Sequence, residues 1–540
     1  MNRLQASRSR PGNQESERRI ELVKASVSLI FFCLLGLLVR YQLIGPLQSD
    51  RFVEPAFYQR YMGIPVGLSR GNIVDRHGIP LHYPVWGNAI ARLSAGAGSK
   101  DPVAEKVVRE ASPEQVDEVL GRERGEGWAV VPEEIRYGPS SLARHVVGHV
   151  RTNAYVNPRD NVGEGGLEKW FQDSLSGRYP SSAGVVLTGE GTGIPGLGIR
   201  VVPPQDKPSD LRTTLDVSVQ LAVEDVLDER GVRKGAALVL DAATGEVLAM
   251  ASRPNYDQKH PERCMDDHDS PFVNRAISAF PPGSVWKTVV MALLLDKGYV
   301  RETDSFLCEG SIEVGDRVVA CGSRESGHGT VTVKEALAYS CNSALIQCVQ
   351  RIPARELVEF ARLSGFGEKT GLELPEESPG VLPNAHSMYL GDLANLAIGQ
   401  GYLLVTPLQV AAFYRSIVDG GMWKSPELIP GSDKTLKRLF GEETAGTLQS
   451  ALLLATRSGT GQAAYIDGFG SAGKTGTAET GHRDGKPHAW FAGWTPLIAP
   501  KYVIVVFVEE GGDGPTVAAP IFHDIAERLL RPDTHTRPLP

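Results

Sequence analysis

Three short strings in this 540-residue chain hold the side chains that a serine acyl-transfer enzyme requires. Ser284 precedes Lys287 by three residues, Ser340 precedes Asn342 by two, and the last string, Lys474–Thr477, is a lysine followed by Thr-Gly-Thr. A serine hydroxyl is a weak nucleophile until a nearby base takes its proton. A lysine amine can be that base once burial lowers its pKa. The strings therefore predict a nucleophile with its base, a second hydroxyl with an amide, and a cation beside hydroxyls.

The residues around Ser284 predict that it stands at the start of a helix. Pro281–Gly283 cannot lie inside a helix, whereas the apolar run Val285–Lys297 is predicted to be helical. Ser284 and Lys287 then share one face of that helix, and its unpaired backbone N–H groups can stabilise an oxyanion. Ser471–Lys474 also matches Ser-x-x-Lys, but its strand-like surroundings make Ser284 the predicted nucleophile.

The second string lies on or between helices, directly after the predicted helical residues Val333–Tyr339. There Ser340 could pass a proton to a leaving amine, and the amide of Asn342 could hold a backbone group of a substrate. By itself such a pair is more often a helix cap or a turn. Its assignment to a catalytic site therefore depends on the other two strings.

The third string follows the small residues Gly470–Gly473 and is predicted to be a strand that another chain can approach closely. The ammonium of Lys474 and the neighbouring hydroxyls suit a terminal carboxylate, and Gly476 leaves room for a peptide along the strand edge. Lys369–Gly371 repeats the Lys-Thr-Gly pattern, but in a loop-like stretch soon after Asn342. We therefore expect the string at Lys474 to hold the substrate.

In this order, the three strings resemble the transpeptidase signature of the penicillin-binding proteins, Ser-x-x-Lys, Ser-x-Asn and Lys-[Ser/Thr]-Gly. The strings Ala397–Gln409 and Ala489–Trp494 agree with the same family, and the resemblance covers nearly the whole chain. It implies that the backbone N–H groups of Ser284 and Thr477 form an oxyanion hole. It also implies these roles: Ser284 is the acylated nucleophile, Lys287 its base, Ser340 a proton relay, Asn342 a holder of the donor peptide, and Lys474, Thr475, Gly476 and Thr477 the substrate-binding strand that holds the donor's carboxylate.

The resemblance implies a monofunctional, class B-like enzyme that cross-links peptidoglycan stem peptides by D,D-transpeptidation and is inhibited covalently by β-lactams. The D-Ala-D-Ala donor would acylate the serine, and an amine of a neighbouring stem peptide would then attack the acyl-enzyme. A D,D-carboxypeptidase, a serine β-lactamase and a β-lactam sensor or scaffold with little turnover use the same residues and stay open as alternatives. The N-terminal part is too short for a glycosyltransferase domain, so a separate membrane glycosyltransferase is the implied partner.

The fold class predicted for the catalytic part is α/β, of the α+β type. Strands from both of its ends enclose a helical middle, which predicts one five-stranded antiparallel sheet covered by helices on both faces. The predicted strands and the final helix are Ala236–Asp241, Val247–Ser252, Gly470–Thr477, Ala489–Thr495, Tyr502–Glu509 and Val517–Leu530. Four segments follow from the whole pattern: a basic cytoplasmic tail (1–24), a membrane anchor (25–44), a mixed non-catalytic pedestal or dimerisation-like module (47–205), and the transpeptidase domain (211–535), with a Gly/Pro-rich boundary at 191–208.

One apolar segment near the N-terminus predicts the membrane anchor. Ala25–Val39 carries no charge over 15 residues, which is short of the roughly 20 needed to span a bilayer, but a snorkelling Arg40 extends it. No Ala-x-Ala-like cleavage site follows it, so we expect an uncleaved anchor and not a signal peptide. Basic residues precede the segment and place the N-terminus in the cytoplasm and the catalytic domain outside. These residues are Arg3, Arg8, Arg10, Arg18, Arg19 and Lys24.

Two motifs in the non-catalytic module are predicted to be structural. Arg70–Gly78 has turn residues and no nucleophile-plus-base set, and we expect a polar hairpin with buried salt-bridge partners. Gly163–Glu168 opens an amphipathic run that is predicted to be helical. Both motifs resemble the module that precedes the transpeptidase domain in class B penicillin-binding proteins.

The charge and the cysteine content of the chain limit which other functions are possible. The 56 Lys+Arg against 64 Asp+Glu give a net charge of −8 without a basic tract, which excludes nucleic-acid binding. No set of His, Cys or acidic residues has metal-ligand spacing, so neither a metal nor a cofactor is predicted. Cys308 and Cys321 bracket a strand-turn-strand-like loop outside the membrane, where we expect a disulfide; two unpaired thiols are the alternative.

Overall fold

The computed structural model describes most of the predicted catalytic domain. The described residues are 11–40, 57, 60–65, 70–94, 103–108, 111–120, 128–151, 162–177, 182–186, 200–202, 208–322, 326–431, 435–480 and 485–532. Each predicted segment lies partly outside them: residues 1–10 of the tail, 41–44 of the anchor, several stretches of 47–205, most of 191–208, and 323–325, 432–434, 481–484 and 533–535 of the catalytic domain.

The chain divides into two compact units, each made of segments that are separate in the sequence. One unit consists of Met1–Ile64, Ala89–Val131 and Ser182–Val202, and the other of Pro65–Asn88, Pro132–Ser181 and Pro203–Pro540. The second unit holds all three strings predicted to do chemistry. It also contains segments before residue 205, which the sequence alone grouped with the preceding module.

A five-stranded antiparallel sheet forms the centre of the second unit, as predicted. Its strand order is β10-β9-β19-β18-β17, and every neighbouring pair is antiparallel. The strands are β9 (Gly235–Asp241), β10 (Val247–Arg253), β17 (Ala472–Ala478), β18 (His488–Thr495) and β19 (Tyr502–Val508). Strand β17, which carries the third string, is therefore at an edge of this sheet.

Alternate residues of the central strands face opposite sides of the sheet, as the two-residue period of a strand requires. In β19, Val503, Val505 and Phe507 belong to one buried cluster, whereas Ile504 and Val506 belong to another. Burying such side chains on both faces contributes about 1.5–3 kcal/mol each. This explains why β19 is apolar along its whole length.

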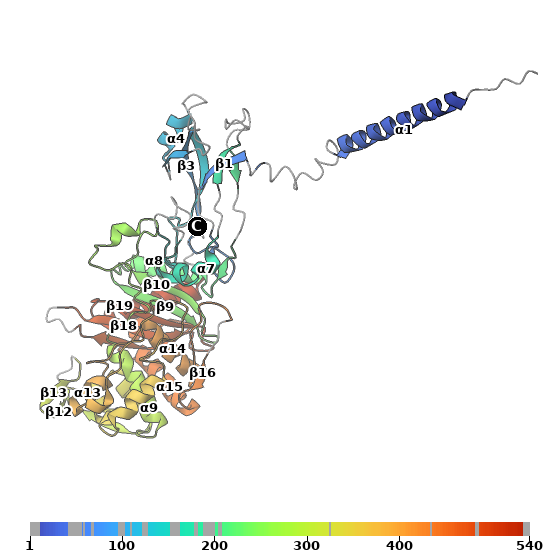
Figure 1. Ribbon diagram of the computed structural model, residues 1–540. Helices are drawn as coiled ribbons and strands as arrows, with labels where there is room; N and C mark the ends of the chain where they lie inside the picture. The colour runs from blue at the N-terminus through green and yellow to red at the C-terminus, as the bar shows by residue number, and fades with distance from the viewer. Residues whose placement is uncertain are drawn as a thin grey trace, which may run out of the picture. The chain divides into compact units, whose positions relative to one another are not determined.

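Helices cover both faces of the sheet. Helices α8 (Val217–Glu229) and α16 (Ala519–Leu530) share a buried cluster with Ile504 and Val506, whereas α14 (Pro407–Val418) shares the cluster of Phe507. In Figure 1, α8 and α14 accordingly lie on opposite sides of the sheet. The predicted fold class and its covered sheet are confirmed.

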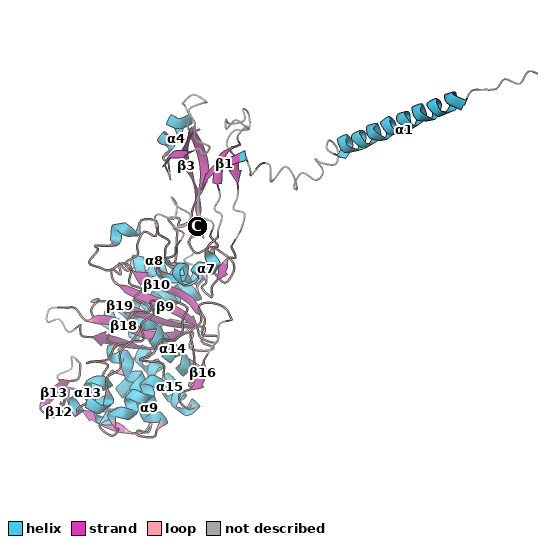
Figure 2. Cartoon of the chain, viewed as in Figure 1, coloured by secondary structure: helices cyan, strands magenta, loops and turns pink. Residues whose placement is uncertain are grey.

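The chain between β10 and β17 supplies the helices that surround the site, most of them on the α14 side of the sheet (Figure 2). They are η5 (Gly283–Trp286), α9 (Lys287–Asp296), α10 (Val333–Ala338), α11 (Asn342–Val349), α12 (Ala354–Leu363), α13 (Leu390–Ala397) and α15 (Glu442–Arg457). Three two-stranded ribbons accompany them: β11 (Ser305–Cys308) with β14 (Gly329–Thr332), β12 (Ser311–Val314) with β13 (Arg317–Ala320), and β15 (Met422–Lys424) with β16 (Leu436–Arg438).

The first unit contains the N-terminal helix and most of two small sheets. Within helix α1 (Pro11–Val39), Ser16–Val39 is long and apolar enough to cross a membrane, with a mean hydropathy of 2.4 over an 18-residue window. The strand orders are β1-β6-β7 and β4-β3-β5. The remaining elements are β1 (Tyr61–Pro65), β3 (Val85–Ser94), β4 (Val103–Val108), α4 (Pro113–Leu120), β5 (Trp128–Ile135), β6 (Ser182–Val186) and β7 (Arg200–Val202).

A buried ion-pair network joins the two motifs that were predicted to be structural. Arg70 Nε donates to Glu168 Oε2 at 2.5 Å, and Arg136 Nε donates to Glu168 Oε1 at 2.7 Å. Tyr137 adds a hydroxyl donor to the same carboxylate at 3.0 Å. Burial by itself raises the pKa of Glu168, but the two guanidinium groups lower it to about 2. The expected salt-bridge partner of the first motif thus comes from the second.

Asp75 of the first motif holds a turn and the start of helix α8. Its Oδ1 accepts the backbone N–H groups of His77 and Ile79, each at 2.8 Å, and its Oδ2 accepts that of Val217 at 3.2 Å. Because α8 packs on the large sheet, this carboxylate connects the motif to the catalytic part of the second unit. No catalytic role is needed to explain these residues.

Candidate active site

Ser284 lies in η5, a 3-10 turn that leads directly into α9. The predicted position at a helix start is therefore observed, with a tighter first turn than an α-helix has. Gly283 has a φ of 55°, and a Cβ there would lie 2.5 Å from the carbonyl oxygen of Thr477. Trp490 Nε1 donates to the carbonyl of Pro281 at 3.0 Å. Close packing against the sheet thus fixes the turn that presents Ser284.

Lys287 is fully buried and donates three hydrogen bonds to the second string. Its Nζ lies 2.7 Å from Ser340 O, 3.2 Å from Ser340 Oγ and 2.5 Å from Asn342 Oδ1. Burial lowers the pKa of Lys287 to about 8. Such an amine is partly neutral near neutral pH, which an exposed lysine is not.

A break between α10 and α11 presents the second string, so residues 333–349 form two helices and not one continuous helix. Ser340 stands in the break with a φ of 60°, a conformation that non-glycine residues seldom adopt. Cys341 caps α11, where its sulfur accepts the backbone N–H of Ala344. Asn342 Nδ2 also donates to Ala320 O at 2.9 Å. The amide is thereby held with its oxygen toward Lys287.

The third string lies on β17 with its lysine buried beneath it. Lys474 Nζ donates to the carbonyl of Thr475 at 3.1 Å, and burial together with the charge of Lys287 holds the pKa of Lys474 well below its usual range. The hydroxyl of Thr475 lies 2.7 Å from that of Thr460, and Thr477 Oγ1 accepts the backbone N–H of Gly514 at 3.2 Å. This edge strand therefore presents two oriented hydroxyls above a buried amine.

A cleft of about 700 Å³ brings residues of all three strings to one surface. Its lining residues are Ser284, Cys321, Gly322, His328, Tyr339, Ser340, Asn342, Ser458, Gly459, Thr460, Gln462, Thr475, Thr477, Asp513, Pro515 and Thr516. Lys287 and Lys474 are buried completely and lie beneath it. A hydroxyl nucleophile, a buried amine and a peptide-binding strand edge in one cleft can support acyl transfer.

Neither Ser471 nor the string Lys369–Gly371 lines this cleft. Ser471 is buried, and its hydroxyl donates to Ala464 O at 2.6 Å. Lys369 Nζ is bonded to the carbonyl of Pro375 at 3.3 Å, and the neighbouring Thr370 hydroxyl donates to Glu377 at 2.6 Å. Ser471, Lys369 and Thr370 therefore form hydrogen bonds within their local structure and are not placed to act in the cleft.

The family model described as Penicillin binding protein transpeptidase domain matches residues 235–527, which is more than half of the chain. The chain belongs to this family. The matched range contains the large sheet and all three strings. The fold and the cleft described above are therefore those of a penicillin-binding protein transpeptidase domain.

Relatives with curated names include other penicillin-binding proteins. Stage V sporulation protein D of Bacillus subtilis (strain 168) is 28% identical, over 96% of this chain and 88% of its own. Penicillin-binding protein PbpB of Mycolicibacterium smegmatis is 30% identical, over 82% of this chain and 69% of its own.

Solved structures are similar over most of the chain. A peptidoglycan synthase complex that coordinates polymerization and crosslinking contains a chain with a TM-score of 0.71 and 28% identity, covering 94% of this chain and 98% of that one. Penicillin-binding protein 3 of Mycobacterium tuberculosis, complexed with ampicillin, has a TM-score of 0.64 and 26% identity, covering 88% and 98%. The fold of this penicillin-binding protein is thus shared beyond the matched domain.

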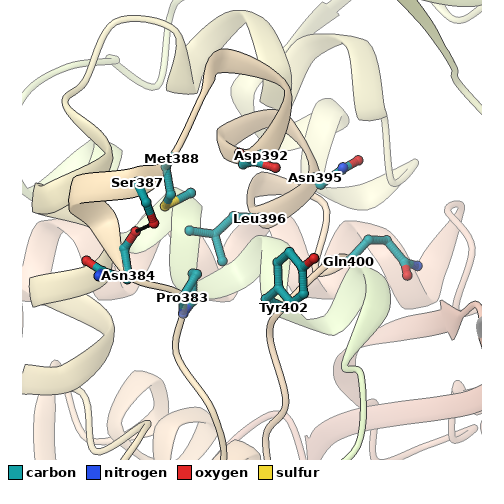
Figure 3. A pocket seen from close by; sticks show the side chains of 10 residues that line it. Pro383, Asn384, Ser387, Met388, Asp392, Asn395, Leu396, Gln400 and Tyr402 are labelled. Atoms are coloured by element: carbon teal, nitrogen blue, oxygen red, sulfur yellow. Dashed lines mark hydrogen bonds between the residues drawn. The ribbon is translucent and has the colours of Figure 1, made fainter.

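A second pocket, of about 290 Å³, lies between the loop before α13 and the loop that follows it (Figure 3). Its lining residues include two hydroxyls, those of Ser387 and Tyr402. The Ser387 hydroxyl donates to the carbonyl of Asn384 at 3.2 Å, and the carboxylate of Asp392 caps α13 by accepting the N–H of Tyr389. Among the described residues that line it there is neither a lysine nor a histidine. The described lining of this pocket therefore contains no amine comparable to Lys287.

The predicted disulfide between Cys308 and Cys321 is wrong, because both thiols are free. The loop between them does form the β12–β13 hairpin, but the two sulfurs face a common histidine, His328, and not each other at bonding distance. Cys341 completes the group. These four residues are a cluster that the sequence interpretation missed, because long gaps separate them: 12, 6 and 12 residues.

Proposed function

We propose that the protein is a peptidoglycan D,D-transpeptidase that works through an acyl-enzyme on Ser284. The observation that carries the proposal is Lys287, a buried amine of lowered pKa three residues after a hydroxyl that lines the cleft. The amine is held by Ser340 and Asn342 in a position from which it can exchange protons. An exposed lysine of ordinary pKa would be a poor base at neutral pH.

In the first half of the reaction, the Ser284 hydroxyl attacks the penultimate D-Ala carbonyl of a donor stem peptide. Neutral Lys287 takes the hydroxyl proton, and the backbone N–H groups of Ser284 and Thr477 stabilise the oxyanion. When the C–N bond breaks, the proton passes through Ser340 to the leaving amine of the terminal D-Ala. Lys287 is then neutral again, and the donor is bound as an ester.

In the second half, an amine on a neighbouring stem peptide attacks that ester. Lys287 accepts the proton of the amine and returns it to the serine oxygen as the ester breaks, so a new peptide bond forms and Ser284 is regenerated. Asn342 holds the donor backbone, and the donor adds to the free edge of β17 as an extra strand. Lys474, Thr475 and Thr477 bind the carboxylate of the donor or of a β-lactam, and Gly476 leaves space for the peptide.

The names of relatives support this assignment. A protein of Acinetobacter baumannii named peptidoglycan D,D-transpeptidase MrdA is 26% identical over 92% of this chain. Peptidoglycan D,D-transpeptidase PbpA of Mycobacterium tuberculosis is 31% identical over 59% of it. The ampicillin complex of penicillin-binding protein 3 shows that a similar fold accepts a β-lactam.

The N-terminal helix is assigned as a membrane anchor, with the basic tail in the cytoplasm and the catalytic unit outside. The helix has the length and composition for a single span. A separate membrane glycosyltransferase is the proposed partner, because this chain would cross-link strands that another enzyme polymerises. The similarity to a chain of a complex that coordinates polymerization and crosslinking supports that partnership.

Reconstitution tests the activity. Full-length protein in detergent is mixed with nascent peptidoglycan from a separate glycosyltransferase, and cross-linked dimers and released D-Ala are measured. We expect both products from the wild type and from Ser471→Ala, and neither from Ser284→Ala, which should also lose labelling by a fluorescent penicillin. Release of D-Ala without dimers would instead indicate a carboxypeptidase, hydrolysis of the bound drug a β-lactamase, and labelling without either product a sensor.

A further inference from the structure

Three thiols and one imidazole converge at one wall of the catalytic cleft. The ligand atoms of Cys308, Cys321, His328 and Cys341 all lie within 4.8 Å of one another. Cys321 and His328 also line the cleft. The proposed reaction uses none of the four side chains.

The distances inside this group are those of a tetrahedral metal site. Nδ1 of His328 lies 3.5 Å from the sulfurs of both Cys308 and Cys321, and the sulfurs of Cys321 and Cys341 are 3.5 Å apart. With Zn–S near 2.3 Å and Zn–N near 2.0 Å, a regular tetrahedron separates two sulfurs by about 3.8 Å and a sulfur from a nitrogen by about 3.5 Å. A single ion fits between the four atoms with little movement.

Backbone N–H groups favour the thiolate form at two of the sulfurs, whereas burial opposes a charge there. The three cysteines are at most 1% exposed. The sulfur of Cys321 accepts the backbone N–H of Asn342 at 3.2 Å, and that of Cys341 accepts the N–H of Ala344 at 3.4 Å. Hydrogen bonds from backbone N–H groups to ligand sulfurs orient the metal ligands and stabilise their charge.

We propose that Cys308, Cys321, His328 and Cys341 bind one Zn²⁺ in a closed structural site that holds the segment Ser340–Asn342 in place. Three thiolate ligands and one imidazole select zinc over hard cations such as Mg²⁺ and Ca²⁺. The protein fills all four positions, so no open position remains for a substrate or a water. Binding displaces the three thiol protons and leaves the site with a net charge of −1.

The ligands come from four segments of the chain, which are also joined by a small buried cluster of Val314, Ile346 and Ala394 and by the hydrogen bond from Asn342 to Ala320. Cys308 ends β11, Cys321 follows β13, and His328 precedes β14, while Cys341 caps α11. The β12–β13 hairpin is mostly exposed, with Val318 at 66% exposure, and a lone two-stranded hairpin is marginally stable in water. One ion bound by all four residues would join this hairpin to the break that carries Ser340 and Asn342.

Metal content tests the site directly and does not depend on cross-linking activity. Full-length protein is purified in detergent with a reducing agent, without chelator, from cells grown with zinc, and zinc per chain is measured by mass spectrometry. We expect about one ion per wild-type chain, and near-complete loss in Cys308→Ser and His328→Ala. Cys348→Ser, which changes an equally buried thiol on α11 outside the cluster, is the matched control and should keep its zinc.

Cobalt substitution and chelation keep the test valid if a variant fails to fold. Wild-type protein stripped of zinc and refilled with Co²⁺ should show the near-ultraviolet thiolate-to-cobalt band of a tetrahedral sulfur site. Stripping should also speed amide exchange at residues 341–344 and slow labelling by a fluorescent penicillin roughly tenfold or more, and zinc should reverse both effects. Zinc-free wild type, a native disulfide among the three cysteines, or equal zinc in Cys308→Ser and Cys348→Ser would overturn the site. Unchanged exchange and labelling after stripping would overturn its role at Ser340–Asn342.

Discussion

The buried amine of Lys287 leads to a quantitative pH prediction. If its neutral form is the base that activates Ser284, the second-order rate constant for acylation by a β-lactam must follow the fraction of neutral amine. That constant reports ionisations of the free protein. The perturbation is therefore pH itself, applied to the unmodified enzyme.

The magnitude follows from the pKa of about 8 that burial gives to Lys287. About 1% of the amine is neutral at pH 6, about 9% at pH 7 and half at pH 8. Acylation should consequently accelerate roughly fifty-fold between pH 6 and pH 8, with a slope of about tenfold per unit at the acidic end. Burial also lowers the pKa of Lys474, so loss of the charge that binds the carboxylate of the drug should bend the curve downward as the pH rises.

Stopped-flow mixing with a fluorescent penicillin measures this rate constant across the pH range. Lys287→Arg should fold, as judged by circular dichroism, yet lose acylation by several orders of magnitude, because a guanidinium does not deprotonate at these pH values. Lys369→Arg makes the same change at the competing Lys-Thr-Gly string and should behave like the wild type. A flat rate constant between pH 6 and pH 8, or near-normal acylation by Lys287→Arg, would refute the assignment of the base.

Three further predictions concern stability, space and recognition. Glu168→Gln should destabilise the protein by about 3–5 kcal/mol in urea unfolding at pH 7, because two buried arginines lose their carboxylate. The control Glu164→Gln changes a partly exposed ion pair and should cost about 1 kcal/mol or less. Equal costs for the two variants would contradict the buried network. Since the folded-state pKa of Glu168 is lowered from 4.5 to about 2, its stabilisation should be complete above pH 4.5 and disappear as the pH falls toward 2. Gly476→Ala would put a Cβ 2.9 Å from a carbonyl oxygen of the turn before Ser284, so we expect a folded protein with little penicillin labelling, and normal labelling would show that the turn can move. Lys474→Ala should raise the β-lactam concentration needed for half-maximal labelling more than it lowers the maximal rate, and an unchanged concentration dependence would remove Lys474 from carboxylate binding.

The large sheet was predictable because its information is local. Tyr502–Val508 and Gly235–Asp241 are short apolar runs bounded by turn residues, which is the pattern of strands buried on both faces. The position of Ser284 at a helix start followed from two prolines and a glycine before an apolar run. In each case a few neighbouring residues exclude the competing structures.

The environment of the predicted site residues was not predictable in the same way. The break at Ser340 has a strained φ that local preference opposes, and packing around Lys287 and Asn342 maintains it. The pairing of Arg70 with Glu168 joins residues 98 positions apart. Neither feature leaves a pattern in a short window of sequence.

The cysteines show the difference most clearly. The sequence established a chain with three acyl-transfer strings in family order, an apolar N-terminal helix and a covered antiparallel sheet, because residue type and short-range spacing carry those properties. It suggested a disulfide for two cysteines because they bracket a hairpin-like loop that was predicted to lie outside the membrane. Only the tertiary structure brought Cys308, Cys321, His328 and Cys341 within 4.8 Å of one another and buried Lys287 against Ser340. Ligand geometry and lowered pKa values depend on which distant segments pack together, and that is decided by the folded core.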